Sequence, residues 1–233
     1  MKKLFFLALV FLGVFYYLSS NEPKLPETIN PNTGGGNSDT TSSKTNSNLD
    51  LSKFSDEDVQ YFKEVALKAE YSDINSGEVC KWNSDMNIFV KGDKSEVLMS
   101  ELNRIVTELN GIINTIEINI VDDPSQANYT IYFGNQYGYQ EIEPASIGYT
   151  ENNWGLFVVP SGTTIKGGTM YVDTERCTSI DAQKHLLREE LTQSLGLFND
   201  SEKYPNSIFQ QAWTETTEYA DIDVRMIQML YNN

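Results

Sequence analysis

The chain has 233 residues, 39% of them hydrophobic and 12% aromatic, which allows one folded domain of about 180 residues with a sizeable core. Its formal net charge of −16 is uneven: the first 53 residues carry 5 Lys+Arg and 4 Asp+Glu, which leaves 12 and 29 for residues 54–233. A domain this acidic repels phosphate backbones, so nucleic acid is excluded as a partner, and without a D-x-D-x-D-G loop we interpret the charge as serving solubility and not calcium binding.

Residues 1–20 are typical of an export signal. Two lysines precede an apolar run at 4–18, which two serines follow. The run is short for a membrane span of about 20 residues, which favours cleavage, but Leu18 is bulky for a cleavage site. An uncleaved membrane anchor therefore stays open as the alternative. In both cases we expect an extracytoplasmic domain, either secreted or attached to the membrane only through this segment.

Residues 21–53 form the second region. They are rich in Pro, Gly, Ser, Thr and Asn and contain few apolar residues, so they cannot bury enough surface to fold. We expect a disordered linker with a reach of ~30 Å.

The third region, residues 54–233, is predicted to be one α+β domain. The apolar spacing predicts, in chain order, a helix at 55–70, a strand at 86–90, a helix at 95–110, strands at 116–120, 129–133, 156–159 and 169–173, and helices at 180–196 and 221–231. Residues 134–153 are aromatic and glycine-rich, and we expect them to be irregular. This order of elements indicates an α+β fold with a mixed sheet.

The helix at 180–196 carries the most informative pattern. Leucines recur along it at helical spacing and predict one buried face. Beside that face, His185, Glu189 and Gln193 fall four residues apart, with Glu190 about 100° around the axis. Polar groups gathered in this way indicate a site. For His185, the single histidine of the chain, a solvated or capping role is favoured over metal ligation.

Cys80 and Cys177 are the two cysteines of the chain. An even number in an exported protein favours a disulfide bond between them. It would close a loop of nearly a hundred residues and contribute ~4–5 kcal/mol in the loop-entropy model. Two buried free thiols are the alternative.

Four stretches within residues 126–231 together resemble the metzincin zinc peptidases, most closely the matrixin branch. They are Ala127-Asn128-x-x-Ile131-x-Phe133, Gly167-Gly168-Thr169-Met170-Tyr171-Val172-Asp173, Glu190-x-x-Gln193-x-x-Gly196-Leu197-x-Asn199-Asp200 and the run from Asp221 to Tyr231. Residues 205–209 resemble the segment that holds the methionine turn of that family. The resemblance implies a zincin-like mixed β-sheet, an active-site-type helix at 180–196 and a C-terminal helix. If residues 169–173 lie at the sheet edge as in metzincins, an extended peptide can add there as a strand.

The zinc ligands of that family are replaced in this chain. In metzincins three imidazoles hold zinc, and the glutamate after the first one activates the bound water. Here Glu189, Gln193 and Asn199 occupy the three ligand positions, and Glu190 keeps the general-base position. An amide is a poor zinc ligand, and a carboxylate near its ordinary pKa of about 4.3 is a weak base toward water. We therefore expect no metal and no cofactor, and ordinary zinc proteolysis is disfavoured.

A closer resemblance is to a bacterial family of exported domains of unknown function. Its signature is R-E-E-x-x-Q-x-x-G-L followed by N-D and S-I-F. The matching residues are Arg188, Glu189, Glu190, Gln193, Gly196, Leu197, Asn199, Asp200, Ser207, Ile208 and Phe209. The resemblance implies that the replaced ligands are a family pattern, and it supplies no reaction.

Three interpretations of Glu189, Glu190 and Gln193 stay open. In the first, they hydrogen-bond residues 205–209 and the last helix, with Arg188 pairing one carboxylate. In the second, they line a cleft that binds a peptide or glycan without cutting it. In the third, they belong to a hydrolase that uses an unconventional metal or the paired carboxylates.

We expect an exported, zincin-like domain that acts as a non-proteolytic binding or structural module of the cell envelope. Its partner in the cleft is then an extended peptide or a glycan, with Arg188, Asn199 and Asp200 as binding residues. The alternative is a peptidase-like hydrolase, in which Glu190 is the first catalytic residue and Glu189 and Gln193 follow. In that case loss of Glu190 abolishes activity.

Overall fold

The computed structural model describes residues 51–67, 79–160, 162 and 164–232. The predicted export signal and most of the predicted linker lie outside these residues. The last three linker residues form a short 3-10 helix, η1 (Leu51–Lys53). Within the described ranges, no helix combines the length and the apolar character needed to cross a membrane.

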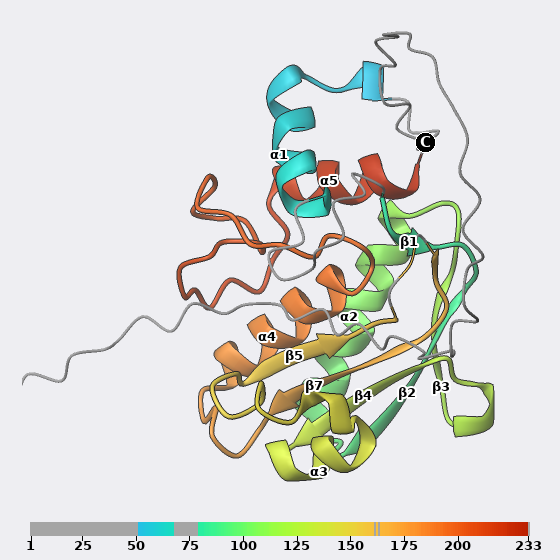
Figure 1. Cartoon of the computed structure of the whole chain (residues 1–233), viewed down its shortest axis with the longest axis vertical. Helices are drawn as coiled ribbons and strands as arrows, with labels where there is room; N and C mark the ends of the chain where they lie inside the picture. The colour runs from blue at the N-terminus through green and yellow to red at the C-terminus, as the bar shows by residue number, and fades with distance from the viewer. Residues whose placement is uncertain (1–50, 68–78, 161, 163, 233) are drawn as a thin grey trace, which may run out of the picture.

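A five-stranded mixed sheet forms the centre of the domain (Figure 1). Its strands, in spatial order, are β3 (Ile118–Val121), β2 (Met86–Gly92), β4 (Tyr129–Gly134), β7 (Gly168–Asp173) and β5 (Gly155–Val158). The first four are parallel to one another, and β5 runs antiparallel to β7. A separate parallel pair joins β1 (Lys81–Trp82) and β6 (Thr164–Ile165). In the described part of the chain, β5 is thus the antiparallel edge of the main sheet.

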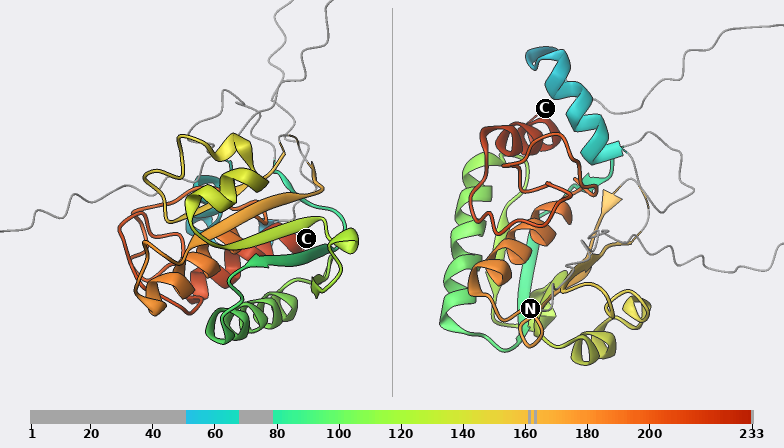
Figure 2. Two further views of the ribbon diagram at one scale, coloured as in Figure 1. Left: turned by 90° about the horizontal axis from the view of Figure 1, so that it is seen from below. Right: turned by 90° about the vertical axis from the view of Figure 1, so that its left-hand side faces the viewer.

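Helices cover both faces of this sheet. One face carries α2 (Glu96–Ile112) and α4 (Ile180–Gln193), and Figure 2 shows α3 (Gln136–Ile142) on the opposite side. At one end of the domain α1 (Asp56–Leu67) packs against α5 (Asp221–Tyr231). Two short 3-10 helices, η2 (Pro124–Gln126) and η3 (Pro144–Ser146), complete the described elements.

Strand β7 shows how the sequence separates the two faces. Met170 and Val172 are fully buried in the main core, which also contains the leucines of α4. Tyr171 points to the other face, where it stacks on Tyr139 of α3 with ring centroids 4.6 Å apart. Side chains alternate along a strand, so the run from Met170 to Val172 is apolar or aromatic at each position because both faces are covered.

Helix α4 packs against β7 and β5, and both local signals and tertiary packing fix its position. Ser179 caps its start by accepting a hydrogen bond from the Ala182 N–H. Its leucines are fully buried, and Gly196, with φ +126°, allows the chain to leave the helix in a left-handed turn. Residues 199–220 then pass back over α4 (Figure 1), so His185, Glu189 and Gln193 are buried as well.

A buried aspartate fixes the returning chain to α5. Asp223 accepts hydrogen bonds from the Ser207 hydroxyl, the Ile208 N–H and the Ala220 N–H. Phe209, which occupies the position of the methionine in the metzincin turn, is fully buried beside it. Loop 207–209 is therefore tied to the first turn of α5 by Asp223 and not by the carboxylates of α4.

The predicted α+β class, with a mixed sheet, a buried helix that begins at residue 180 and a C-terminal helix, is confirmed. The strands and helices lie close to their predicted bounds, although residues 68–70 of the first predicted helix are outside the described ranges. The expectation that 134–153 is irregular was wrong in part, because Asn135 caps α3 through the N–H groups of Tyr137 and Gly138. The expectation that residues 169–173 form the sheet edge was also wrong, since β7 lies between β4 and β5.

The predicted disulfide between Cys80 and Cys177 was wrong, because both cysteines are free. The two residues lie at opposite ends of α4: the Cys80 carbonyl contacts Gly196 after the helix, whereas Cys177 lies just before its Ser179 cap. A helix of 14 residues is about 21 Å long. A disulfide needs Cα atoms about 4.4–6.8 Å apart, so the pair cannot close without rebuilding the core.

We therefore expect two reactive thiols per chain when the protein is denatured without reductant and titrated with Ellman's reagent. In the folded protein the reaction should be slow, because burial raises the pKa of both thiols to about 11. Mass spectrometry after alkylation without reductant supplies the control. Fewer than half a thiol per chain after denaturation would show that the bond exists in solution.

Candidate functional site

A ring of contacts joins the middle of α4, the start of β5 and the segment 213–216. The His185 ring lies 6.0 Å from the Trp213 ring, and Trp213 in turn lies edge-on to Trp154, 6.1 Å away. On the α4 side, His185 Nε2 is 3.3 Å from Glu189 Oε2. Gly155, next to Trp154, has its Cα against the side chain of Glu190. These residues come from three separate parts of the chain and are linked by successive contacts.

The expectation that His185 is solvated or caps the helix was wrong, because its ring is buried and contacts Thr214, Thr216 and Glu189. Its Nδ1–H donates to the Thr216 carbonyl at 2.7 Å, which leaves Nε2 facing the Glu189 carboxylate. Burial lowers the pKa of His185, but the negative charge of Glu189 and the Thr216 carbonyl outweigh burial and raise that pKa above its ordinary value. These two contacts therefore favour the protonated form of the His185 imidazole.

Glu190 is also buried, and part of its carboxyl group has no hydrogen bond. The residue is 5% exposed, and its Oε2 has no hydrogen-bond partner among the described residues. A Cβ on Gly155 would lie 2.7 Å from Glu190 Oε1, so only glycine allows the strand to approach this closely. Burial, and then the charges of Glu189 and Asp200, raise the pKa of Glu190 well above its ordinary value.

The three zinc-ligand positions of the metzincin pattern do not converge. Glu189 faces His185, whereas the Gln193 amide donates to Asp200 Oδ1 at 2.6 Å. The Asn199 amide is turned toward the end of α1, where it donates to the Glu64 and Val65 carbonyls. Within the described ranges, no group of three or more His, Cys, Asp or Glu side chains is arranged to hold a metal ion. The donor set and its orientation do not fit a zinc ion held in the metzincin manner.

Arg188 points away from this region. It is fully buried, and its guanidinium contacts Glu108 Oε2 at 2.5 Å and Glu101 Oε1 at 3.2 Å, both on α2. The ring of Tyr219 covers it at 4.4 Å. Arg188 therefore joins α4 to α2, and neither Glu189 nor Glu190 is its partner.

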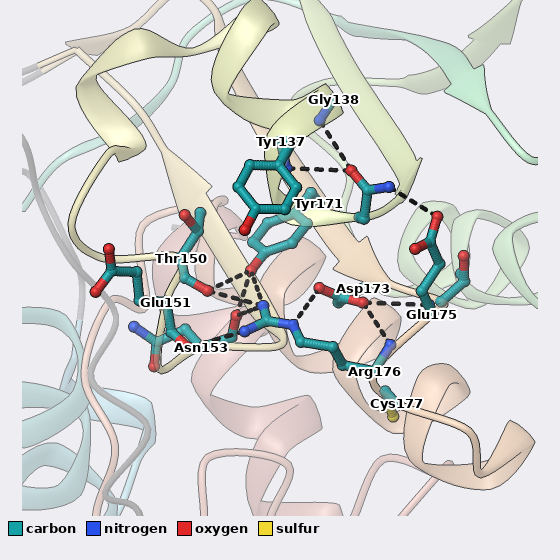
Figure 3. Close-up of polar contacts among 12 residues, drawn as sticks. Tyr137, Gly138, Thr150, Glu151, Asn153, Tyr171, Asp173, Glu175, Arg176 and Cys177 are labelled. Carbon is teal, nitrogen blue, oxygen red and sulfur yellow. Dashed lines mark hydrogen bonds and ion pairs between the residues drawn. The ribbon is translucent and has the colours of Figure 1, made fainter.

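A clamp at the end of β7 positions the strand start that carries Trp154. The buried Asp173 carboxylate accepts from the Glu175 and Arg176 N–H groups and from the Arg176 guanidinium (Figure 3). Arg176 also donates to the carbonyls of Thr150, Glu151 and Asn153 (dashed lines in Figure 3). The loop before β5 is thus held by the Arg176 guanidinium through its main-chain carbonyls.

The site that the sequence predicted on α4 is found in part. His185, Glu189 and Glu190 lie together, and Gln193 pairs with Asp200 one turn further along. The prediction missed Trp213 and Gly155, which come from other segments. The glycine at the start of the predicted strand 156–159 is a signal that could have indicated a close approach at Gly155, whereas Trp213 lies in a segment without apolar periodicity.

A family profile decides the classification, because it matches residues 55–233 and so covers nearly the whole folded region. The chain belongs to the family described as Protein of unknown function (DUF2927). The expected membership in a family of unknown function is confirmed, whereas the signature motif predicted for that family stays a prediction. A search of curated proteins gives no significant match.

Several solved structures are similar to the chain at low sequence identity. One structure of myroilysin is 13% identical with a TM-score of 0.42, and the match covers 65% of this DUF2927 chain and 82% of the myroilysin chain. A second structure of myroilysin is 11% identical with a TM-score of 0.44, and the match covers 73% of this chain and 95% of the myroilysin chain. High choriolytic enzyme 1, a hatching enzyme zinc-protease from Oryzias latipes (medaka fish), is 15% identical with a TM-score of 0.35, covering 72% and 98%. These likenesses are too distant to carry an activity to the DUF2927 domain.

The buried Glu190 predicts a pH-dependent stability difference. An unfolded glutamate releases its proton near pH 4.3, whereas folded Glu190 keeps its proton to higher pH because burial and the nearby Glu189 and Asp200 raise its pKa. Above pH 4.3 the unfolded state therefore binds fewer protons, and stability falls as the pH rises toward the folded pKa. The glutamine of Glu190→Gln does not titrate. The free energy of unfolding of this variant, minus that of the wild type, should therefore increase as the pH rises, by at most about 1.4 kcal/mol per pH unit in this window.

Urea unfolding of both proteins at a series of pH values measures this difference. Asp181→Asn removes an exposed carboxylate from the same helix and serves as the control, since its stability difference should stay nearly constant. A Glu190→Gln difference that is flat from pH 4.5 to 8 would mean that Glu190 is solvated.

Proposed function

We propose that this DUF2927 domain is an exported, non-proteolytic binding or structural module built on a zincin-like scaffold. One observation carries the proposal: the side chains at the three zinc-ligand positions are engaged with three different partners. Glu189 faces His185, Gln193 bonds Asp200, and Asn199 bonds the end of α1. A zinc ion would require all three to break these contacts, and two of them would still offer only amides.

The same geometry suggests where a partner binds. Strand β5 pairs with β7 alone among the described residues, so its outer backbone groups are the ones an extended peptide would use by strand addition. Trp154 and Trp213 lie at the start of this strand and are 36% and 41% exposed. Half-exposed aromatic rings contact both peptide side chains and sugar rings, which keeps an extended peptide and a glycan as the two partner classes. The export signal proposed for residues 1–20 would bring the domain to such partners outside the cytoplasm.

A hydrolase is the second candidate, and Glu190 is the observation that favours it. A buried carboxyl with a raised pKa and a free oxygen is a suitable general acid or base. Its neighbour Glu189 lies on the same helix, however, so both carboxylates approach a substrate from one side. That arrangement does not suit the opposed carboxylates of a glycosidase.

Incubation of the full chain with a peptide library and a glycan panel, followed by mass spectrometry, separates the two candidates. We expect no cleavage by the wild type, with or without added zinc. Glu190→Gln is the matched variant, because it keeps the shape of the side chain and removes its acid–base chemistry. Cleavage by the wild type that disappears in Glu190→Gln would overturn the binding-module proposal.

A further inference from the structure

The imidazole of His185 joins the segment 213–216 to α4. His185 is the one histidine of the chain, and the residue is 2% exposed. Its Nδ1 lies 2.7 Å from the Thr216 carbonyl oxygen, and its Nε2 lies 3.3 Å from Glu189 Oε2. The ring of Trp213 lies edge-on to the imidazole, 6.0 Å away. The helix and the segment therefore meet at the two nitrogens of one side chain.

The two oxygens at this imidazole require a protonated ring. A main-chain carbonyl and an ionised carboxylate can only accept hydrogen bonds. A neutral imidazole has one N–H group, which satisfies either the Thr216 carbonyl or the Glu189 carboxylate. The imidazolium ion has two N–H groups and satisfies both. The geometry around His185 is therefore that of the charged form.

The charges near His185 favour the same form. Burial lowers its pKa, but Glu189 on α4, the Thr216 carbonyl and Glu215 in the segment outweigh burial and raise that pKa. Other charged groups of α4, α2 and β7 have partners elsewhere: Lys184 pairs with Asp181, Arg188 with Glu101 and Glu108, and Asp173 with Arg176, while Glu190 lies against Gly155. Glu189 is thus the carboxylate in contact with the ring.

Loss of the proton weakens both contacts of the ring. The bond to Thr216 changes from a charge-assisted hydrogen bond to a neutral one, which is roughly half as strong. At Nε2 a lone pair then faces the Glu189 carboxylate, and the Thr214 hydroxyl, 3.5 Å away, is a distant donor to it. His185 and Glu189 both belong to α4, whereas residues 213–216 form no helix or strand. The segment is therefore the part that yields.

The contacts on either side of the segment do not involve this proton. Arg104 donates to the Thr217 carbonyl after the segment, and the Gln211 N–H donates to a main-chain carbonyl before it. These bonds confine the movement to residues 213–216. That stretch carries Trp213, whose ring packs edge-on against Trp154 at the start of β5. The proton on one buried imidazole thus controls an aromatic contact at the edge strand.

We infer that His185 is a pH-sensitive latch, which holds residues 213–216 on α4 when protonated and releases them, together with Trp213, when deprotonated. The inference goes beyond the proposed function, because it depends on the contacts of His185 and on no partner. The folded pKa of His185 lies above its ordinary value of about 6.5. The latch therefore contributes its full stability below about pH 6.5 and loses it as the pH rises through the folded pKa.

An NMR titration of the full chain measures the protonation step, because one histidine gives one imidazole Hε1 resonance. Its midpoint should lie above about pH 6.5. Glu189→Gln should lower the midpoint by about 1 unit or more, since it removes the carboxylate in contact with the ring. Glu215→Gln removes the same charge from an exposed residue and should lower it by less than about 0.5 unit. A midpoint at or below the ordinary value, or equal shifts in the two variants, would overturn the inference.

Limited proteolysis with endoproteinase Glu-C, read by mass spectrometry, measures the release of the segment. Cleavage after Glu215 is divided by cleavage after Glu117, an exposed residue before β3, so that the pH dependence of the protease cancels. One pH unit below the midpoint found by NMR, this ratio should be at least about threefold higher in His185→Gln than in the wild type. One unit above the midpoint, the two proteins should agree within about twofold. The same excess at both pH values would overturn the inference, because the side chain would then act through its shape alone.

Glu189→Gln keeps the imidazole and replaces His185→Gln in the proteolysis if the latter does not fold. Its excess cleavage after Glu215 should appear one unit below the wild-type midpoint and vanish one unit above it. Absence of that excess would also overturn the inference. Neither measurement uses a partner or a substrate, so its failure leaves the proposed function untouched. Cleavage of the peptide library that is lost in Glu190→Gln would reject the proposed function alone.

Discussion

Arg188→Met is expected to lower the free energy of unfolding by about 3–5 kcal/mol. Arg188 is fully buried between α4 and α2, and it contacts Glu101 and Glu108 while Tyr219 covers its guanidinium. Methionine fills most of the volume but leaves the buried Glu101 carboxylate without this charge. The loss should appear as a lower denaturation midpoint with an unchanged slope in urea.

Arg104→Met is the matched control, because Arg104 also pairs with Glu101 and Glu108. Arg104 is 34% exposed, so solvent screens its ion pairs and the expected loss is at most about 1 kcal/mol. Equal losses of unfolding free energy in the two variants would show that the burial of Arg188 does not make its ion pairs more stabilising than those of Arg104.

Gly196→Ala is expected to cost about 2–5 kcal/mol. Gly196 has φ +126°, a conformation that side chains with a Cβ rarely adopt, and an added Cβ would lie 2.1 Å from the Cys80 carbonyl oxygen. The neighbouring atom is backbone, so it cannot rotate away. Relief would require α4 to end differently or the segment before β1 to move, and both changes disturb the main core.

The control for this substitution is Gly111→Ala on α2. Gly111 has open space around it and lies inside a helix, so alanine should raise the stability by up to about 1 kcal/mol. Thermal unfolding of the two variants should therefore shift in opposite directions. A Gly196→Ala variant as stable as the wild type would mean that the turn after α4 adapts in a way the structure does not show.

The sequence predicts the elements well where periodicity is strong. The leucines of α4 have helical spacing, and Ser179 and Gly196 stand where such a helix begins and ends. The bounds of β4 and β7 follow from short apolar runs between glycine-containing loops. The fold class could be predicted because these local signals agree with one another and with the order of elements.

What could not be predicted depends on contacts between distant segments. The sequence favoured a Cys80–Cys177 bond because it does not show that α4 separates the two residues. It likewise does not show that Arg188 turns to α2, or that Trp213 lies against His185, because rotation around a helix axis is set by packing. Helix α3 was missed since its residues are aromatic and polar without a clear apolar stripe, and Asn135 alone marks its start.

The measurement that tests the central claim most directly is elemental analysis of the full chain after dialysis against zinc and then against zinc-free buffer. The account predicts a zinc content well below one ion per chain, because Glu189, Gln193 and Asn199 are each engaged elsewhere. Gln193→Ala, which removes one of these positions, should leave that content unchanged. One firmly held zinc ion per chain that is lost in Gln193→Ala would contradict the account.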